Sequence, residues 1–209
     1  MESTDKPPAS RKLPVAWLLE GLLIVVSVLL AFAVDEYRET RANRDQARRA
    51  LTGIAAEIEH NLGTLEPFLP SHAAWRDALS GGAPGKAGAT GLDVWFATRP
   101  PIEGRTPFPL LRRSAWDAAI ASGALRFVDF GVASALADVY GMQDQTMANV
   151  QRLASGPLSS ITTYDPASKN ASVRLLWLTL ADIQSAEQLL VGLYRQHLPR
   201  VREAAGAGS

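Results

Sequence analysis

The chain has 209 residues, of which 47% are hydrophobic and 20% are charged, enough for one domain with a sizeable core and a short additional element. Lysine plus arginine equals aspartate plus glutamate at 21 each, so the basic excess of a typical nucleic-acid binder is missing, and nucleic acid is not an expected partner. There is no cysteine, which excludes disulfides, thiolate metal sites and cysteine nucleophiles. A chain without cysteine fits the cytoplasm and the periplasm equally well.

An apolar segment from Leu13 to Val34 follows an N-terminal tail of residues 1–12. As a helix its 22 residues rise about 33 Å, close to the roughly 30 Å hydrocarbon core of a bilayer. Trp17 and Tyr37 lie about 30 Å apart along such a helix, which is the separation of the two aromatic belts at the membrane interfaces. The sequence therefore predicts a single transmembrane helix over residues 13–34, with the lipid bilayer as its partner.

Two other interpretations of this segment stay open. It could be a buried core helix, although a soluble helix of this length usually carries a charged face. It could also be a cleaved signal peptide, because Ala31-Phe32-Ala33 has the small-x-small form of a cleavage site. The apolar run is longer than a typical signal-peptide core and contains Glu20, which favours an uncleaved anchor.

Glu20, Ser27 and Ala31 share one face of the predicted transmembrane helix. Small and polar residues on one face permit close helix approach and interhelical hydrogen bonds, which predicts a homo-oligomer or the binding of an unknown protein partner. Alternatively, Glu20 lies only about 4.5 Å deeper than Trp17 and extends its carboxylate to the headgroups.

The charges that flank the predicted transmembrane helix are consistent with either orientation in the membrane. Arg11 and Lys12 precede the segment and acidic residues follow it directly, which favours a cytoplasmic N-terminus and a periplasmic domain in a bacterial inner membrane. Counting basic residues alone favours the opposite orientation, because five arginines follow between positions 38 and 49.

Residues 35–66 lack a helix breaker and are predicted to continue the anchor as a stalk helix. The early part is charged all round, which indicates a solvated face, although anionic headgroups could bind there. An apolar stripe at three- and four-residue spacing follows and predicts docking into a helical bundle. Its members are Leu51, Ile54, Ile58, Leu62 and Leu65.

The remaining residues, 67–209, are predicted to form a helical soluble domain. A short helix has Phe68, Leu69, Trp75 and Leu79 as its apolar positions. Residues 81–109 contain eleven Gly or Pro residues, too many for regular structure, so a long loop is predicted there. The apolar centre of this loop, residues 92–96, is expected to pack on the core. It is either a partner surface or a variable insertion.

Helical signals return at Ser114. Ser114 and Asp117 have the spacing of a capping box, and Gly123 suits a left-handed helix end. Asp129 can cap a longer helix that ends at Gly156, with the stripe Ala133, Leu136, Tyr140, Met147, Val150 and Leu153. A last helix carries Leu176, Leu180, Ile183, Leu190, Tyr194 and Val201. No strand alternation is evident, so we predict an all-α fold whose first long helix packs into an irregular helical bundle.

The order of these elements resembles a group of uncharacterised bacterial single-pass membrane proteins, families of unknown function. The shared elements are an early Glu in an apolar helix (Glu20-Gly21-Leu22), an Ala-rich exit with charges (31–38), and a Ser-Ala-aromatic-acid helix (114–117) ending at Ser122-Gly123. The resemblance covers roughly residues 15–65 and 107–141 and implies an anchor with a helical domain. It implies no activity. Tyr37 and Asp35 depart from the pattern, since relatives often have Trp and Asn there.

No catalytic motif is found. His60, His72 and His197 are the only histidines, and their spacing does not place them on one helix face as a zinc site would need. There is no nucleophile elbow, Walker loop or dinucleotide fingerprint. Glu57 and Glu59 are interpreted as surface charge. We therefore expect no enzyme activity, metal or cofactor.

Three aromatic residues are candidates for a pocket or partner surface: Trp95, Trp116 and Tyr140. Core packing is the alternative for Trp116, because its helix is too short to persist undocked. The sequence favours a membrane-anchored interaction or scaffold module. A small-molecule sensor would be favoured by a pocket lined by these three residues, and an enzyme would need converging His or carboxylate groups.

Overall fold

The computed structural model describes residues 15–81, 88–100 and 107–206. These residues form six α-helices and three short 3₁₀ turns, and no strand occurs among them. The predicted all-α class is therefore confirmed. The helices are α1 (Val15–Leu65), α2 (Phe68–Ser80), α3 (Gly91–Thr98), α4 (Ser114–Ala121), α5 (Phe130–Ser155) and α6 (Lys169–Gly206). The 3₁₀ turns are η1 (Ala124–Phe127), η2 (Ile161–Tyr164) and η3 (Pro166–Ser168).

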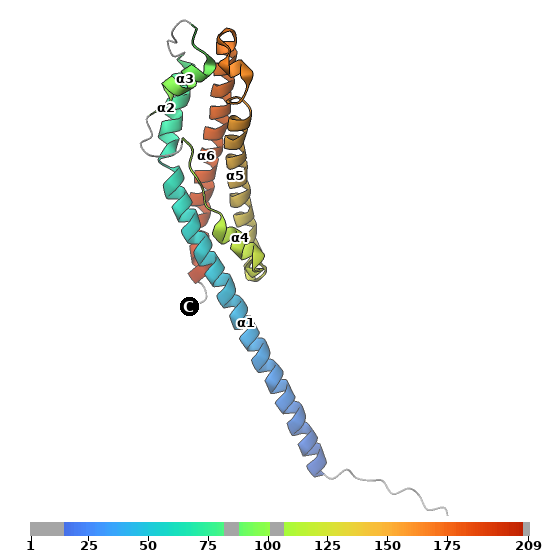
Figure 1. The fold of residues 1–209 in the computed structure, drawn as a ribbon. Helices are drawn as coiled ribbons and strands as arrows, with labels where there is room; N and C mark the ends of the chain where they lie inside the picture. The colour runs from blue at the N-terminus through green and yellow to red at the C-terminus, as the bar shows by residue number, and fades with distance from the viewer. Residues whose placement is uncertain (1–14, 82–87, 101–106, 207–209) are drawn as a thin grey trace, which may run out of the picture. The chain divides into compact units, whose positions relative to one another are not determined.

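The chain divides into two compact units, residues 1–44 and residues 45–209. In the second unit α5 and α6 lie side by side in opposite directions, connected through η2 and η3 (Figure 1). Helices α2 and α3 pack on the first half of α6, while α4 and η1 lie near the start of α5. This unit is a helical bundle with two short helices covering its ends.

The predicted stripes form the core of this bundle. On α1, Leu51, Ile54, Ile58 and Leu65 are at most 3% exposed, while Leu62 is half-buried. All six predicted positions of α6 are buried, which confirms that stripe. On α5 the stripe is confirmed in part, because Leu136, Tyr140 and Leu153 are buried and the others are half-buried.

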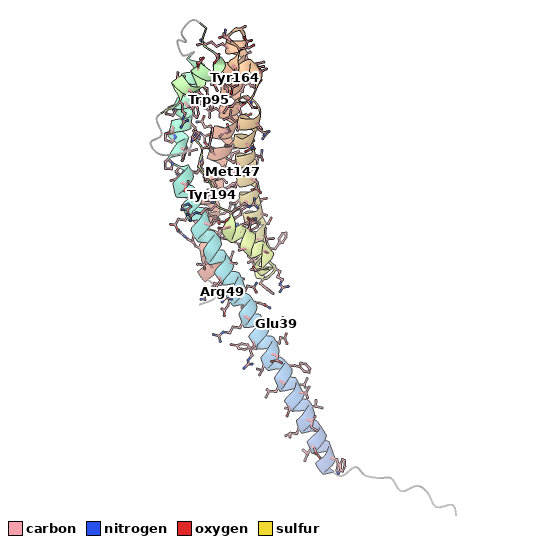
Figure 2. The ribbon with its side chains drawn as sticks, viewed as in Figure 1. Glu39, Arg49, Trp95, Met147, Tyr164 and Tyr194 are labelled. Atoms are coloured by element: carbon pink, nitrogen blue, oxygen red, sulfur yellow. The ribbon has the colours of Figure 1, made fainter. Side chains whose placement is uncertain are left out.

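The buried apolar residues form two clusters. The α4-side cluster joins α1, α4, α5 and the second half of α6, and includes Ile54, Ile58, Trp116, Leu136, Tyr140, Leu190 and Tyr194. The α3-side cluster joins α2, α3, the end of α5 and the first half of α6. It consists of Trp75, Leu79, Val94, Trp95, Leu153, Leu176, Leu180 and Ile183. Figure 2 shows Trp95 and Tyr194 at different levels of the bundle, one from each cluster.

The segment predicted as one long loop, residues 81–109, contains a helix. Helix α3 begins after Thr90, whose hydroxyl accepts from the backbone N–H of Asp93 while the Asp93 carboxylate accepts from the backbone N–H of Thr90. This capping box starts a helix between glycine- and proline-rich stretches. The expected packing on the core is confirmed, since Val94 and Trp95 are each 2% exposed.

Of the helix caps predicted from the sequence, two are confirmed and one is wrong. The side chain of Asp129 accepts from Val132 N–H at the start of α5, and Gly123 is left-handed with φ of 68° after α4. The capping box predicted for Ser114 and Asp117 is wrong. Helix α4 is preceded by Arg113 without a side-chain cap, and Asp117 instead accepts from the Arg113 guanidinium.

In the first unit, the large apolar side chains described on α1 between Trp17 and Tyr37 are 45% to 70% exposed. Among the residues that the structure describes, no helix has a stretch that is both long and apolar enough to cross a membrane. This finding does not support the predicted transmembrane helix, which stays a prediction.

Candidate functional site

Polar side chains interrupt the apolar stripes of α2, α5 and α6 between the two clusters. They are buried: His72 on α2, Gln143 and Thr146 on α5, and Gln184 and Glu187 on α6. On α5 and α6, members of the α4-side cluster lie on one side of these positions and members of the α3-side cluster on the other. On α2, Leu69 packs against the α4-side cluster before His72, and Trp75 of the α3-side cluster follows it. We call these five residues, with Glu57 and Asn61 of α1, the polar layer. The buried carboxylates, the buried imidazole and most of the buried amide side chains of the described residues belong to it.

Glu57 is bound by four donors from two other elements. Its carboxylate accepts from Ser114 Oγ at 3.1 Å, from the backbone N–H of Ala115 at 2.8 Å and of Trp116 at 3.3 Å, and from the Tyr140 hydroxyl at 2.7 Å. Backbone N–H groups in the first turn of a helix lack intrahelical partners and favour an anion. Glu57 therefore caps α4 from a different helix.

The prediction that Glu57 is surface charge is wrong, because Glu57 is 6% exposed. The matching prediction for Glu59 is confirmed, since its side chain is 63% exposed and forms an ion pair with Arg202. The burial of Tyr140 and its hydrogen bond to the negative Glu57 carboxylate raise the pKa of the Tyr140 hydroxyl. This phenol stays protonated and acts as a hydrogen-bond donor.

Asn61 holds the chain segment that leads into α4. Its amide nitrogen donates to the carbonyl of Arg112 at 2.7 Å, and its oxygen accepts from the backbone N–H of Arg112 at 2.8 Å. Gln143 donates to the same carbonyl at 2.9 Å and accepts from the Tyr194 hydroxyl at 2.6 Å. These bonds link α1, α5 and α6 around Arg112. Burial raises the pKa of Tyr194.

His72 and Glu187 form a fully buried pair, with both side chains 0% exposed. Nδ1 of His72 lies 2.7 Å from Glu187 Oε2, and Nε2 lies 2.8 Å from the carbonyl oxygen of Pro107. A backbone carbonyl only accepts, so Nε2 carries a proton, and an ionised carboxylate at Nδ1 requires the second one. The geometry therefore fits an imidazolium paired with a carboxylate.

The surroundings of His72 act in opposite directions on its pKa. Burial lowers the pKa of the imidazole, while the hydrogen bond and charge of Glu187 and the Pro107 carbonyl raise it, and the net pKa lies above 6.5. The rings of Phe68 and Phe108 lie 5.6 and 5.2 Å from the imidazole, within range of cation–π attraction. Both ring nitrogens are engaged and shielded from solvent, so the pair serves to connect α2, α6 and the Pro107 segment.

The three histidines do not converge. His72 is buried, His60 is exposed and His197 is half-buried on α6. In the described ranges, no group of three or more His, Asp or Glu side chains has an arrangement that could hold a metal ion.

The three aromatic candidates do not line one pocket. Trp116 stacks on Tyr140 with ring centroids 4.8 Å apart and planes at 9° in the α4-side cluster. Trp95 lies in the α3-side cluster, 4.0 Å from Trp75 between ring centroids. All three are at most 7% exposed, so they belong to packed cores.

The residues predicted to act in a membrane lie in the first unit. Trp17 is 70% and Tyr37 is 66% exposed. Glu20, Ser27 and Ala31 are exposed as well, and the Ser27 hydroxyl donates to the carbonyl of Leu23 at 2.8 Å within its own helix. Their predicted roles at the interface and in association are not tested by these positions.

The sequence analysis did not predict the polar layer, although the positions of two of its members indicate burial. Glu57 lies three residues after Ile54, and Glu187 lies four residues after Ile183, so each is on the buried side of an apolar stripe. A polar residue at a stripe position indicates a buried hydrogen-bonding group. Its partner comes from another helix, and the stripe alone does not reveal which.

Comparison with protein-family models, with characterised proteins and with solved structures gives no match for this chain.

Proposed function

We propose that the protein is a membrane-anchored helical interaction module, a scaffold without catalysis of its own, in which residues 13–34 enter a lipid bilayer. The observation that supports this most is the exposure of apolar side chains all round α1 between Trp17 and Val34. Burying one such side chain fully is worth about 1.5–3 kcal/mol, so an uncovered segment of this length is unfavourable in water. In the sequence, the apolar run begins at Leu13, two positions before the first residue that the structure describes.

The apolar side chains surround α1 in this segment, whereas an interface with one soluble partner needs a single apolar face. Lipid covers a helix from every side, which favours the bilayer over a partner protein as the main occupant. The proposal includes a bacterial inner membrane with residues 35–209 in the periplasm, on the basis of Arg11 and Lys12. It also includes kinship with the uncharacterised single-pass proteins that the chain resembles.

Extraction with alkaline carbonate tests the anchor. We expect the full-length parent to stay in the membrane pellet, and a Val25→Arg/Leu29→Arg variant to move to the supernatant, because an arginine at the bilayer centre costs about 2.5–3.5 kcal/mol. The matched control is Leu189→Arg on α6, since Leu189 is 61% exposed and Leu29 is 62% exposed. A parent chain in the supernatant, or a mature chain that begins near Val34, would contradict the anchor.

The partner of the anchor is proposed to be a second copy of this chain. Glu20, Ser27 and Ala31 form the contacting face, where small and polar contacts contribute roughly 1 kcal/mol each. Ser27→Leu or Ala31→Leu should weaken crosslinking in membranes. Val26→Leu, on another face, should leave it unchanged. Equal crosslinking of all three variants would favour a monomer in which Glu20 reaches the headgroups.

The orientation is tested by a reporter after Ser209. Alkaline phosphatase activity of such a fusion supports a periplasmic domain. Fluorescence of ordinary green fluorescent protein, with no phosphatase activity, would reverse the proposed orientation.

A further inference from the structure

A surface pocket lies where α5 ends beside the first half of α6 (Figure 1). It has a volume of about 500 Å³, within the range of small-molecule sites. Its apolar wall contains Leu175 of α6 and Pro157, which follows α5. Leu175 is 46% exposed and Pro157 is half-buried, so a ligand in the pocket can contact both side chains.

Two opposite charges line the pocket without pairing with each other. Arg152 lies in the last turn of α5, and Asp182 lies on α6. Neither forms an ion pair with a residue in the part of the chain that the structure describes. The Arg152 guanidinium donates instead to Oδ1 of Asn149. The pocket therefore presents a cation and an anion to the same bound molecule.

The amide nitrogen of Asn149 is a further donor at the pocket. Asn149 lines the pocket and is 9% exposed, so it is about nine-tenths buried. Its Oδ1 accepts from Arg152, whereas its Nδ2 has no acceptor among the described residues. In the described ranges, the side-chain nitrogen and oxygen atoms that are closed to solvent and lack a partner belong to four other residues. Nδ2 is therefore open to solvent, and an acceptor in the pocket can reach it.

These three groups match the two charges of a zwitterion. A guanidinium fits the two oxygens of a carboxylate, and an amide N–H adds another donor to them. The Asp182 carboxylate accepts hydrogen bonds from an ammonium group. Gly156, at the C-terminal end of α5, also lines the pocket, and the partial negative charge of a helix end favours a cation there. An α-amino acid carries its carboxylate and its ammonium on one carbon atom.

We propose that this pocket binds an α-amino acid with an apolar side chain. Arg152 and Nδ2 of Asn149 bind its carboxylate, Asp182 binds its ammonium group, and its side chain lies against Leu175 and Pro157. The site is independent of the proposed membrane anchor, because every residue in it belongs to the second unit. It makes the bundle a ligand-binding module as well as a scaffold.

The test uses the full chain with ¹⁵N-asparagine, in nanodiscs of zwitterionic lipid, or in buffer if the carbonate experiment finds no anchor. An Asn149→Ser variant assigns the side-chain amide resonances of Asn149. Leucine should shift these resonances saturably and leave those of Asn61, in the polar layer, and Asn170, in another surface pocket, unchanged.

Two analogues of leucine each lack one charge. 4-Methylpentanoate is leucine without the ammonium group, and 3-methylbutan-1-amine is leucine without the carboxylate. Each should bind at least about tenfold more weakly than leucine, a difference of roughly 1.4 kcal/mol. Leucine binding no tighter than that of 4-methylpentanoate would overturn the proposal.

Variants separate this site from general charge effects. Arg152→Ala and Asp182→Asn should each weaken leucine binding about tenfold. Arg200→Ala on α6 and Asp138→Asn on α5, at exposed charges outside the pocket, should leave binding unchanged. Near-UV circular dichroism checks that each variant keeps the parent fold. A non-saturating shift, or equal effects of Asp182→Asn and Asp138→Asn, would also overturn the proposal.

Discussion

Residues 17–37 and residues 47–65 belong to the same helix, α1, and both are rich in large apolar side chains. In the first stretch the described ones are 45% to 70% exposed, whereas Leu51, Ile54, Ile58 and Leu65 of the second are at most 3% exposed. The first stretch is apolar on every face, and the second has one apolar stripe with polar residues between its members. Burial in the bundle therefore follows the pattern of apolar residues and not their number.

The largest expected difference comes from removing one apolar side chain in each stretch. Ile58→Ala should lower the free energy of unfolding by about 3–5 kcal/mol, because Ile58 is fully buried in the α4-side cluster and its truncation leaves a cavity. Leu29→Ala, at a side chain 62% exposed, should change it by less than about 0.5 kcal/mol. Urea unfolding of the full chain in mild detergent, followed by near-UV circular dichroism, measures both. Equal losses of unfolding free energy for Ile58→Ala and Leu29→Ala would contradict the conclusion that only the second stretch is buried in the bundle.

Each stretch also contains a carboxylate. Glu57→Ala should destabilise the bundle by about 2–3 kcal/mol, because two backbone N–H groups of α4 and the Tyr140 hydroxyl lose their acceptor. Glu20→Ala should have almost no effect on the same unfolding transition, since Glu20 is exposed. Glu59→Ala is the control within the second stretch. A loss for Glu57→Ala no larger than that for Glu59→Ala would contradict the capping role.

The smallest of the expected changes in unfolding free energy comes from the titration of His72. The pKa of His72 is raised in the folded protein, so its stabilisation is complete below about pH 6.5 and is lost as the pH rises through the higher folded pKa. Each unit of difference between the folded and unfolded pKa contributes about 1.4 kcal/mol. The unfolding free energy of the parent should therefore fall as the pH rises above about 6.5 and through the raised folded pKa of His72.

Two variants sharpen this measurement. Glu187→Gln removes the charge that raises the pKa of His72, so its stability should depend less on pH. His60→Gln, at an exposed histidine of the second stretch, should keep the pH dependence of the parent. A parent chain that gains stability relative to Glu187→Gln as the pH rises would contradict the assignment.

The sequence predicted those parts of the fold that depend on local pattern. The stripes of α1 and α6 recur at three- and four-residue spacing, and periodicity of this kind is visible in a short window. The caps by Asp129 and Gly123 also involve only neighbouring residues, and both predictions are confirmed. Helix α3 was missed because the glycines and prolines around it outweighed the capping-box spacing of Thr90 and Asp93.

The candidate site depends on contacts between residues far apart in the chain. Glu57 binds groups 57 to 83 positions away, and His72 lies 115 positions from Glu187. No local pattern identifies such partners. For the same reason the sequence grouped Trp95 with Trp116 and Tyr140, although the structure places Trp95 in a different cluster.

The polar layer also determines the register of the helices. At some positions of α6 a slip by four residues would exchange one aliphatic side chain for another, as where Leu180 would take the place of Leu176. The same slip would bring Ile183 or Val191 opposite His72 and leave a buried imidazolium without its carboxylate. An uncompensated buried charge costs about 3–5 kcal/mol, more than a slipped apolar contact could return. We therefore expect the His72–Glu187 pair to select one alignment of α2 and α6 among several that the apolar residues alone would allow.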